Sequence, residues 1–234
     1  MAPTLTSRIP SISRARRNLA FEVVSSLRSE IILGKLEPGV SLSEPVLAKK
    51  FGFSRAPIRE ALIELEREGL VEFQATGRTR VRLLVESDFL EIRDARVALE
   101  SMGARRAAAR WTTGDTAWIE VNLEAQANAS TLAELSRLDI DLHEYVMLRG
   151  DNKRVLALWQ SIRGQFEMCL AKLHRNQQSL AFEPRQITVN AHRRLLTALA
   201  SGSPEKAAQT MAAHIENSME WVPIYNQVLE AALD

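Results

Sequence analysis

Histidine is the residue type best suited to binding a metal in this sequence, and its 234 residues include only four. Three of them, His143, His192 and His214, lie among leucine, methionine and isoleucine residues at the spacing of a buried helix face. Asp139 precedes His143 by four residues, so both side chains project from one face and can bind one ion. The fourth histidine, His174, lies near an expected helix end and is predicted to be exposed.

A metal ion would explain why polar side chains occupy these apolar positions. A buried carboxylate without a partner is rare, because its desolvation is costly. Three neutral imidazoles and one carboxylate suit a divalent transition ion, with Zn²⁺ preferred and Ni²⁺, Fe²⁺ or Mn²⁺ also compatible. The alternative is that each histidine is an ordinary core residue held by hydrogen bonds, since an Asp-x-x-x-His spacing also arises by chance.

A second chemistry depends on the segment FSRAPIREALIELEREGL, residues 53–70, which predicts a helix with clear ends. Ser54 can cap the N-terminus through its hydroxyl, Pro57 falls in the first turn, and Gly69 ends the helix. Apolar residues recur at the spacing of one buried face, namely Ile58, Ala61, Leu62 and Leu65.

The other face of this helix separates its charges. Arg55 and Arg59 project together from the N-terminal half, and four glutamates crowd the C-terminal half, namely Glu60, Glu64, Glu66 and Glu68. Phosphate groups repel the acidic end, so only the first two turns can approach a nucleic acid, as in a recognition helix. The alternative is an amphipathic helix with a solvated charged face.

The flanking residues favour the nucleic-acid interpretation. A first helix is expected over about 17–33 and a shorter one from Ser43 to Gly52, and only a tight turn separates the latter from Ser54. Two helices joined in this way form a helix-turn-helix.

A hairpin is predicted directly after this helix. Apolar residues alternate on both sides of Thr76, Gly77 and Arg78, which indicates two short strands joined at that turn. Such a hairpin forms the wing of a winged helix, and Arg80 and Arg82 add to its positive charge. The start of the helix and the hairpin tip are therefore expected to form one DNA-binding surface.

Composition and charge divide the chain into two domains. Residues 1–85 carry 14 Lys/Arg and 9 Asp/Glu, a net charge of +5, whereas residues 86–234 carry 16 and 20, a net charge of −4. Only the basic N-terminal part is therefore expected to meet a polyanion. Residues 1–16 are predicted to be a flexible basic arm, and 17–85 the DNA-binding domain. The absence of a signal peptide, of a long apolar segment and of a second cysteine predicts a cytoplasmic protein.

Residues 86–234 show a helical pattern throughout and predict a bundle of six or seven helices. The expected helices are residues 88–111, 114–129, 132–148, 153–175, 183–200, 204–221 and a short one at 224–233. The fold class is therefore mainly α, with a winged helix-turn-helix of three helices and a hairpin followed by an all-α domain.

The segment ILGKLEPGVSLSEPVLAKKFGFSRAPIREALIELEREGLVE resembles the N-terminal domain of GntR-type bacterial transcription regulators. The resemblance implies that Arg55 and Arg59 contact operator DNA, together with Ser54, Ala56 and the wing glycine Gly77. It also implies a departure at position 45. Some members carry there an arginine that reaches DNA, and this chain has a proline, so its preferred operator differs.

Three later segments, DIDLHEYVMLRGDNKRVLALW, NAHRRLLTALASGSPEKAA and MAAHIENSM, are similar to the FCD effector domain of one GntR subfamily. Many FCD domains hold a metal through one aspartate and three histidines. The resemblance implies that Asp139, His143, His192 and His214 are these ligands. Metal-bearing members bind small carboxylates or related metabolites beside the ion.

Two arginines on inward helix faces are candidate anchors for such an effector. Arg96 and Arg163 each lie between apolar residues at helical spacing, and either can bind a carboxylate through two parallel hydrogen bonds. The alternative for both is an ion pair with an inward glutamate such as Glu100.

Together these features predict a metabolite-responsive regulator, a repressor rather than an enzyme, that binds a palindromic operator as a homodimer. A metal-dependent enzyme is a second hypothesis. The chain lacks any Glu-x-x-His, and Met147 stands where a zinc-protease motif beginning at His143 would need its second histidine. A third hypothesis, an architectural DNA binder without a ligand, leaves the inward Asp and His residues unexplained.

Overall fold

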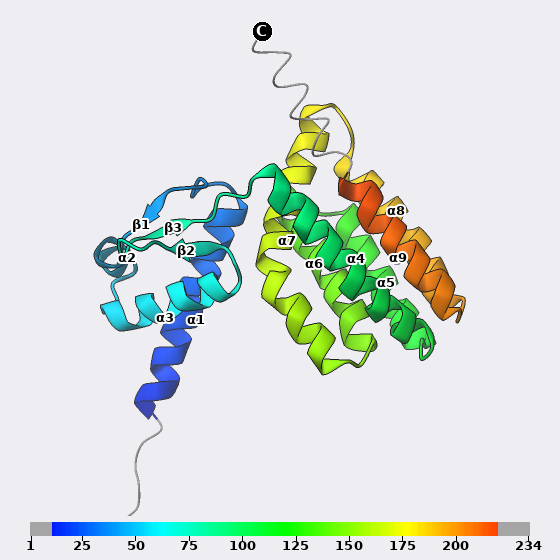
Figure 1. The fold of residues 1–234 in the computed structure, drawn as a ribbon, viewed down its shortest axis with the longest axis horizontal. Helices are drawn as coiled ribbons and strands as arrows, with labels where there is room; N and C mark the ends of the chain where they lie inside the picture. Colours follow the sequence, from blue (N-terminus) through cyan, green and yellow to red (C-terminus); the bar gives the residue numbers. More distant parts are fainter. Residues whose placement is uncertain (1–10, 220–234) are drawn as a thin grey trace, which may run out of the picture. The chain divides into compact units, whose positions relative to one another are not determined.

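The structure, a computed structural model, describes residues 11–219, which form two compact units that divide between Leu83 and Leu84 (Figure 1). Within these residues the chain has nine helices and one three-stranded sheet. The first unit is a winged helix and the second is entirely α-helical, which confirms the predicted fold class. The division lies two residues before the boundary that the sequence predicted.

Three helices form the body of the first unit, namely α1 (Ser11–Ile32), α2 (Glu44–Phe51) and α3 (Arg55–Arg67). The apolar stripe predicted for α3 is fully buried, and Leu27 of α1 is buried as well. Helix α1 begins inside the stretch predicted to be an arm, because both prolines of that stretch, Pro3 and Pro10, precede Ser11. Residues 1–10 lie outside the described residues.

The turn between α2 and α3 depends on Gly52, whose φ of 70° is left-handed and therefore suits glycine. Ser54 occupies the N-cap position of α3, but its hydroxyl makes no capping hydrogen bond, so that part of the prediction was wrong. Val46 of α2 is 65% exposed although it is apolar, because Leu47 is the residue through which this short helix reaches the core. At the other end of α3, Gly69 has a φ of 70°, and the Leu70 N–H donates to the Leu65 carbonyl at 2.9 Å.

The sheet consists of β1 (Ser41–Leu42), β2 (Val71–Phe73) and β3 (Thr79–Val81), in the antiparallel order β1-β3-β2. β2 and β3 form the predicted hairpin, with Val71 opposite Val81. Gly77 turns the hairpin with a φ of 76°. The sequence did not predict β1, because two residues are too few to show an alternating pattern.

Up to residue 219, six helices form the second unit, namely α4 (Glu86–Ala108), α5 (Thr113–Ala127), α6 (Leu132–Arg149), α7 (Lys153–Ser179), α8 (Pro184–Ala200) and α9 (Pro204–Met219). Their order and approximate bounds agree with the sequence, although α7 continues four residues beyond its predicted end. The short helix expected at 224–233 lies outside the described residues. None of the described helices is long and apolar enough to cross a membrane.

Helix α6 contributes to two apolar clusters of this unit. Leu142 and Val146 belong to a cluster that also contains residues of α4, α5, α8 and α9. Ile140 and Met147 belong to another cluster, shared with α4 and α7. Because α6 lies between both clusters, His143, which falls between Ile140 and Met147, is held at the centre of the unit.

The close approach of α4 and the end of α6 gives a first prediction. A Cβ added at Gly150 would lie 3.0 Å from the carbonyl oxygen and 3.2 Å from the Cα of Gly103. We expect Gly150→Ala to lower the free energy of unfolding by about 1–3 kcal/mol, because backbone atoms must shift to make room. Urea unfolding followed by circular dichroism measures the change.

Gly114→Ala is the matched control. Its added Cβ would have only an ordinary contact, 3.6 Å from the Thr112 hydroxyl oxygen, in the first turn of α5. This variant should be unchanged or more stable by up to about 1 kcal/mol. Equal stability of the Gly150→Ala protein and the wild type would show that the two helices can separate at no cost.

Candidate nucleic-acid interface and metal centre

The first two turns of α3 present cationic side chains to solvent. Arg55 is exposed, and 72% of the Arg59 side chain is accessible. The nearest carboxylate to Arg59 is that of Glu44, at 4.0 Å, a distance that leaves the guanidinium able to change partner. Ser54 is exposed beside them, and Ala56 is half-buried. These four residues are therefore accessible to a polyanion, and their contact with DNA stays a prediction.

The hairpin tip adds to the same face of the winged helix. Thr76, Gly77 and Arg78 are exposed, and Gly77 and Arg78 line a shallow groove with Glu44 and Pro45 at the start of α2. Glu44 thus lies beside both the hairpin tip and the Arg59 guanidinium, which places the wing next to the start of α3.

Farther along the hairpin, Arg80 donates to the Glu72 carboxylate, so its charge is partly neutralised. The other two hairpin arginines, Arg78 and Arg82, make no ion pair within the part of the chain that the structure describes. Arg78 is therefore the cation best placed at the tip of the wing.

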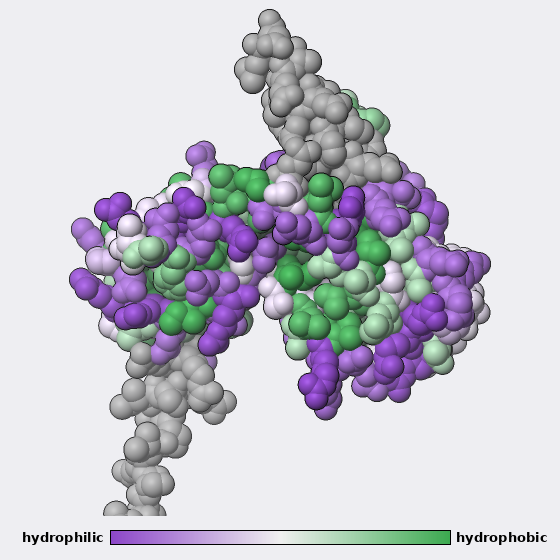
Figure 2. Space-filling view, viewed as in Figure 1, coloured by the Kyte–Doolittle hydropathy of each residue, from purple (hydrophilic) through white to green (hydrophobic). Residues whose placement is uncertain are grey.

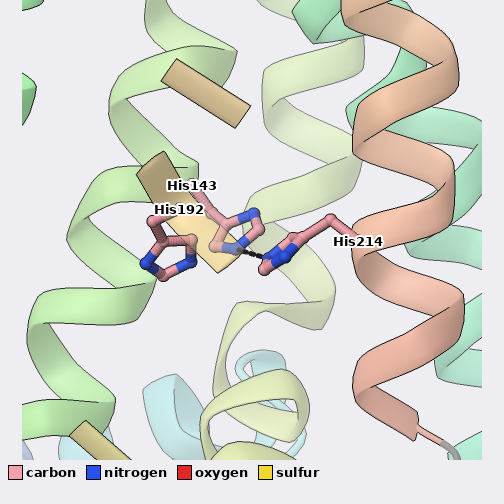
Figure 3. Close-up of side chains that lie close together, drawn as sticks. All are labelled: His143, His192 and His214. Carbon is pink, nitrogen blue, oxygen red and sulfur yellow. Dashed lines mark hydrogen bonds between the residues drawn. The ribbon is translucent and has the colours of Figure 1, made fainter. Parts of the chain in front are cut away.

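In the helical unit, the rings of His143 from α6, His192 from α8 and His214 from α9 converge (Figure 3). One ring nitrogen from each lies within 4.8 Å of the other two, and the Nε2 atoms of His143 and His214 are 3.2 Å apart. Asp139 lies one turn before His143, with Oδ1 at 3.4 Å from Nε2 of His143 and 3.8 Å from Nε2 of His192. The structure thus brings together all four residues predicted as ligands.

Neighbouring acceptors orient two of these rings. Nδ1 of His143 lies 2.5 Å from a carboxylate oxygen of Glu100, and Nδ1 of His192 lies 2.9 Å from the amide oxygen of Gln126. Both oxygens accept, so each Nδ1 carries the hydrogen and each Nε2 directs its lone pair toward the centre of the cluster. That is the tautomer a metal ligand needs.

Burial determines the charges of these groups. It lowers the pKa of His192 and of His214 well below the usual value, and neighbouring positive charges add to the effect, so both rings are neutral at pH 7. Burial also raises the pKa of Asp139 to about 6. Burial alone would raise the pKa of Glu100, but Arg96 and His143 outweigh it and hold that pKa well below its usual range.

Two atoms of the cluster remain unsatisfied. Oδ1 of Asp139 and Nε2 of His192 are buried and make no hydrogen bond to any of the described residues. Leaving such atoms unpaired costs about 1–3 kcal/mol each. One divalent ion bound by three imidazole nitrogens and a carboxylate oxygen would satisfy both, so the residues present fit a transition metal.

A cavity of about 480 Å³ lies beside the cluster. Asp139, His143 and His214 line it, and so do the two cations Arg96 and Arg194. Neutral polar side chains form much of the remaining wall, among them Gln177, Thr188, Gln209, Asn217 and Ser218. The cavity can therefore hold a small polar anion next to the cluster.

Comparison with known proteins identifies both units. Residues 19–81 match the family described as bacterial regulatory proteins, gntR family, and residues 91–217 match the FCD domain. The chain belongs to the GntR family. It is a transcriptional regulator with an FCD domain, not an enzyme.

Individual relatives agree with this assignment. The "Probable D-xylose utilization operon transcriptional repressor" of Paenarthrobacter nicotinovorans is 28% identical over 203 residues, 86% of this chain and 87% of the relative. The "Gluconate operon transcriptional repressor" of Bacillus licheniformis is 29% identical over 156 residues, 65% of this chain and 64% of the relative. In fold, this GntR regulator is similar to E. coli McbR/YncC, with a TM-score of 0.72 and 21% identity. The alignment covers 90% of this chain and 98% of that protein.

The two predicted effector anchors of this GntR regulator lie in different surroundings. Arg96 reaches the cavity, but its Nε donates to Glu100 at 2.7 Å, which is the alternative named from the sequence. Arg163 does not line the cavity. It contacts three carboxylates instead, those of Asp141, Glu144 and Glu167. The structure therefore argues against Arg163 as an effector anchor, because its charge is already matched outside the cavity.

The prediction that His174 is exposed was wrong. His174 is only 1% accessible because α7 continues past it to Ser179 and its ring faces the core. Its Nδ1 lies 2.9 Å from the Ser136 hydroxyl and its Nε2 lies 3.3 Å from the Thr188 hydroxyl. Three further polar residues have no sequence pattern that separates them from a solvated surface, namely Gln126, which holds the His192 ring, and the cavity residues Gln177 and Arg194.

The buried His174 gives a pH-dependent prediction. Burial, aided by the charge of Arg175, lowers its pKa from 6.5 to about 4. Between these values the unfolded chain binds more protons than the folded chain, so stability falls as the pH falls. From pH 7 to pH 5 this group should reduce the free energy of unfolding by about 2 kcal/mol.

His174→Gln tests this contribution, because the amide can keep both hydrogen bonds but does not titrate. Urea unfolding at the two pH values, with EDTA present to exclude metal, should show a weaker pH dependence in the variant by about 2 kcal/mol. Identical pH dependence in the two proteins would mean that His174 is protonated in the folded state as readily as in the unfolded chain.

Proposed function

We propose that this GntR regulator is a cytoplasmic repressor that binds a two-fold operator as a homodimer and responds to a small carboxylate metabolite. The effector binds beside a divalent transition ion, preferably Zn²⁺, held by Asp139, His143, His192 and His214. One observation carries the sensing part of this proposal, the convergence of three imidazole nitrogens and an unsatisfied carboxylate oxygen beside a cavity whose wall is partly polar.

The exposed arginines support the DNA-binding part. Arg55 and Arg59 lie on the N-terminal turns of α3, the part of a recognition helix that contacts base edges in the major groove. Arg78 at the wing tip can contact backbone phosphate, which positions the unit without reading sequence. Pro45 removes one further cationic contact from this surface, so we expect α3 and the wing to carry the operator preference.

Charge supports a carboxylate as the effector. The buried groups near the site are the anions Asp139 and Glu100 and the cation Arg96, so a divalent ion would leave the site with a net positive charge. When bound, that ion supplies an electrophilic centre to which a carboxylate oxygen can bind. Arg194 contributes a second cation to the cavity wall, and the structure shows no ion pair for it among the described residues.

The neutral part of the cavity supports a hydroxylated effector. Gln177 is 2% exposed and its Oε1 makes no hydrogen bond to any described residue, so it can accept one from a ligand. Two relatives are named for the D-xylose utilization operon and for the gluconate operon. A small hydroxy acid would match the polar side chains of the wall and the gluconate name, whereas D-xylose is a neutral sugar that shares only the hydroxyl groups.

The two-fold operator follows from one helix-turn-helix per chain, since paired units read paired half-sites. Exposed apolar side chains of the helical unit support contact between two copies, among them Met102, Val121, Leu148 and Leu158. Figure 2 shows such apolar surface on this unit. Effector binding can change operator affinity only if the effector binds two conformations of the dimer with different strength.

The first test concerns α3. Arg59→Ala should weaken operator binding by about 1–3 kcal/mol if its guanidinium contacts a base. The operator is first selected from random DNA by the wild-type protein, and fluorescence anisotropy then measures affinity. Arg67→Ala is the control, because Arg67 lies at the C-terminal end of the same helix and its side chain is 71% accessible. If the two substitutions weakened operator binding equally, the start of α3 would not be part of the DNA interface.

The second test concerns the metal and the effector. We expect His192→Ala and His214→Ala to lose bound metal but keep their helical content and operator binding, because each removes one ligand and no apolar packing. Elemental analysis measures the metal, and a thermal-shift screen with small carboxylates, followed by operator titration, measures the response. Both variants should lose any effector response of the wild-type protein.

His174→Gln is the matched control for metal binding alone, since this buried histidine lines the cavity but lies outside the converging group. It should keep its metal. A wild-type protein that holds no metal and takes up none from Zn²⁺, Ni²⁺ or Mn²⁺ would contradict the site. A wild-type protein whose operator affinity no metabolite changes would instead indicate a ligand-independent DNA binder.

A further inference from the structure

Glu100 is a fully buried carboxylate that neither the sequence motifs nor the proposed ligand set includes. It lies on α4, which supplies none of the four proposed ligands. One oxygen accepts from Nε of Arg96 at 2.7 Å and from the indole N–H of Trp159 at 2.9 Å. The other lies 2.5 Å from Nδ1 of His143. Glu100 therefore links α4, α6 and α7 at the centre of the unit.

The geometry separates Glu100 from the ion itself. It contacts Nδ1 of His143, whereas Nε2 on the opposite side of the ring faces His214 and Asp139. Glu100 therefore contacts the site through the imidazole of His143, and its charge acts on the other ligands only at a distance. A carboxylate in this position keeps the hydrogen on Nδ1, holds the ring in one orientation and makes Nε2 more basic.

Arg96 and Phe166 hold Glu100 in place. The guanidinium carbon of Arg96 lies 3.2 Å from the centre of the Phe166 ring, and the same ring meets the edge of His143 with centroids 5.5 Å apart. Arg96 is 2% exposed, so each of these two buried charges stabilises the other. The function that the sequence suggested for Arg96, effector binding, is therefore weaker than its function as the partner of Glu100.

We propose that Glu100, with its partner Arg96, is a positioning residue for the metal site, setting the tautomer and orientation of His143 and thereby the affinity for a divalent ion. This inference rests on the metal site of the proposed function. The alternative is that Glu100 and Arg96 are only an ion pair of the core. Such a pair would affect folding but would leave the metal affinity of the folded protein unchanged. Losing such a partner typically weakens metal binding by about 10–100-fold.

The test replaces both charges at once, because Glu100→Gln alone would leave Arg96 buried and unpaired. Arg96→Met/Glu100→Leu removes the acceptor for Nδ1, and Arg96→Met/Glu100→Gln keeps an amide oxygen that can still accept. The control Arg149→Met/Asp115→Asn removes another ion pair of the same unit, with Asp115 buried and its Oδ1 2.7 Å from Nε of Arg149. All variants are made in the full chain.

Competition with a chelating dye measures the Zn²⁺ affinity of each metal-free protein, and elemental analysis gives the number of ions per chain. We expect the Leu variant to bind Zn²⁺ about 10–100-fold more weakly, the Gln variant to lose less, and the control to match the wild type. The visible absorption of bound Co²⁺ should also change in the Leu variant, since a freed ring alters the coordination. A general loss of folding would instead lower the number of sites.

A metal-independent measurement completes the test. In ¹⁵N NMR of the metal-free protein, His143 should carry its hydrogen on Nδ1 in the wild type and lose that preference in the Leu variant. A folded Leu variant with wild-type Zn²⁺ affinity would overturn this inference and leave the metal site intact. A wild-type protein that binds no Zn²⁺, Ni²⁺ or Mn²⁺ would overturn the metal site itself, and this inference with it.

Discussion

The burial of polar groups inside the helical unit is the constraint on which the rest of that unit depends. Asp139, His143, His192 and Glu100 are each at most 4% exposed, in a core otherwise built from aliphatic and aromatic side chains. Buried polar groups are stable only when they are paired, and those that lack a partner cost free energy. The network satisfies most of them internally and leaves two adjacent atoms unsatisfied.

The proposed metal site would account for this pattern. A structural network is expected to satisfy its own members, as His174 does through Ser136 and Thr188. In the proposed metal site, acceptors hold the Nδ1 atoms of His143 and His192, while their Nε2 atoms face one another and Asp139. A ligand that binds these atoms would therefore recover the free energy that their lack of partners costs.

The winged helix follows the opposite principle. Its core is apolar, with Ile58, Leu62 and Leu65 fully buried, and its charges remain in solvent. Exposed cations have weak partners and can exchange them for phosphate at little cost, as the 4.0 Å separation of Arg59 and Glu44 indicates. One chain thus combines a surface of solvated charges with a cavity that lies beside buried charges.

Much of this could be predicted from the sequence, because local rules decide it. Helical periodicity placed the described helices within a few residues, and the spacing of Asp139 and His143 put both on one face of α6. Properties that depend on packing between distant segments required the tertiary structure. The burial of His174, the two-residue strand β1 and the exposure of Val46 depend on neighbours far along the chain.

The surroundings of the two inward arginines also depend on the tertiary structure. Arg96 and Arg163 each have a glutamate four residues ahead on the same helix, Glu100 and Glu167, but only the assembled bundle decides that Arg96 reaches the cavity while Arg163 meets further acidic side chains outside it. A helix determines which residues share a face, and the packing of several helices determines what that face meets.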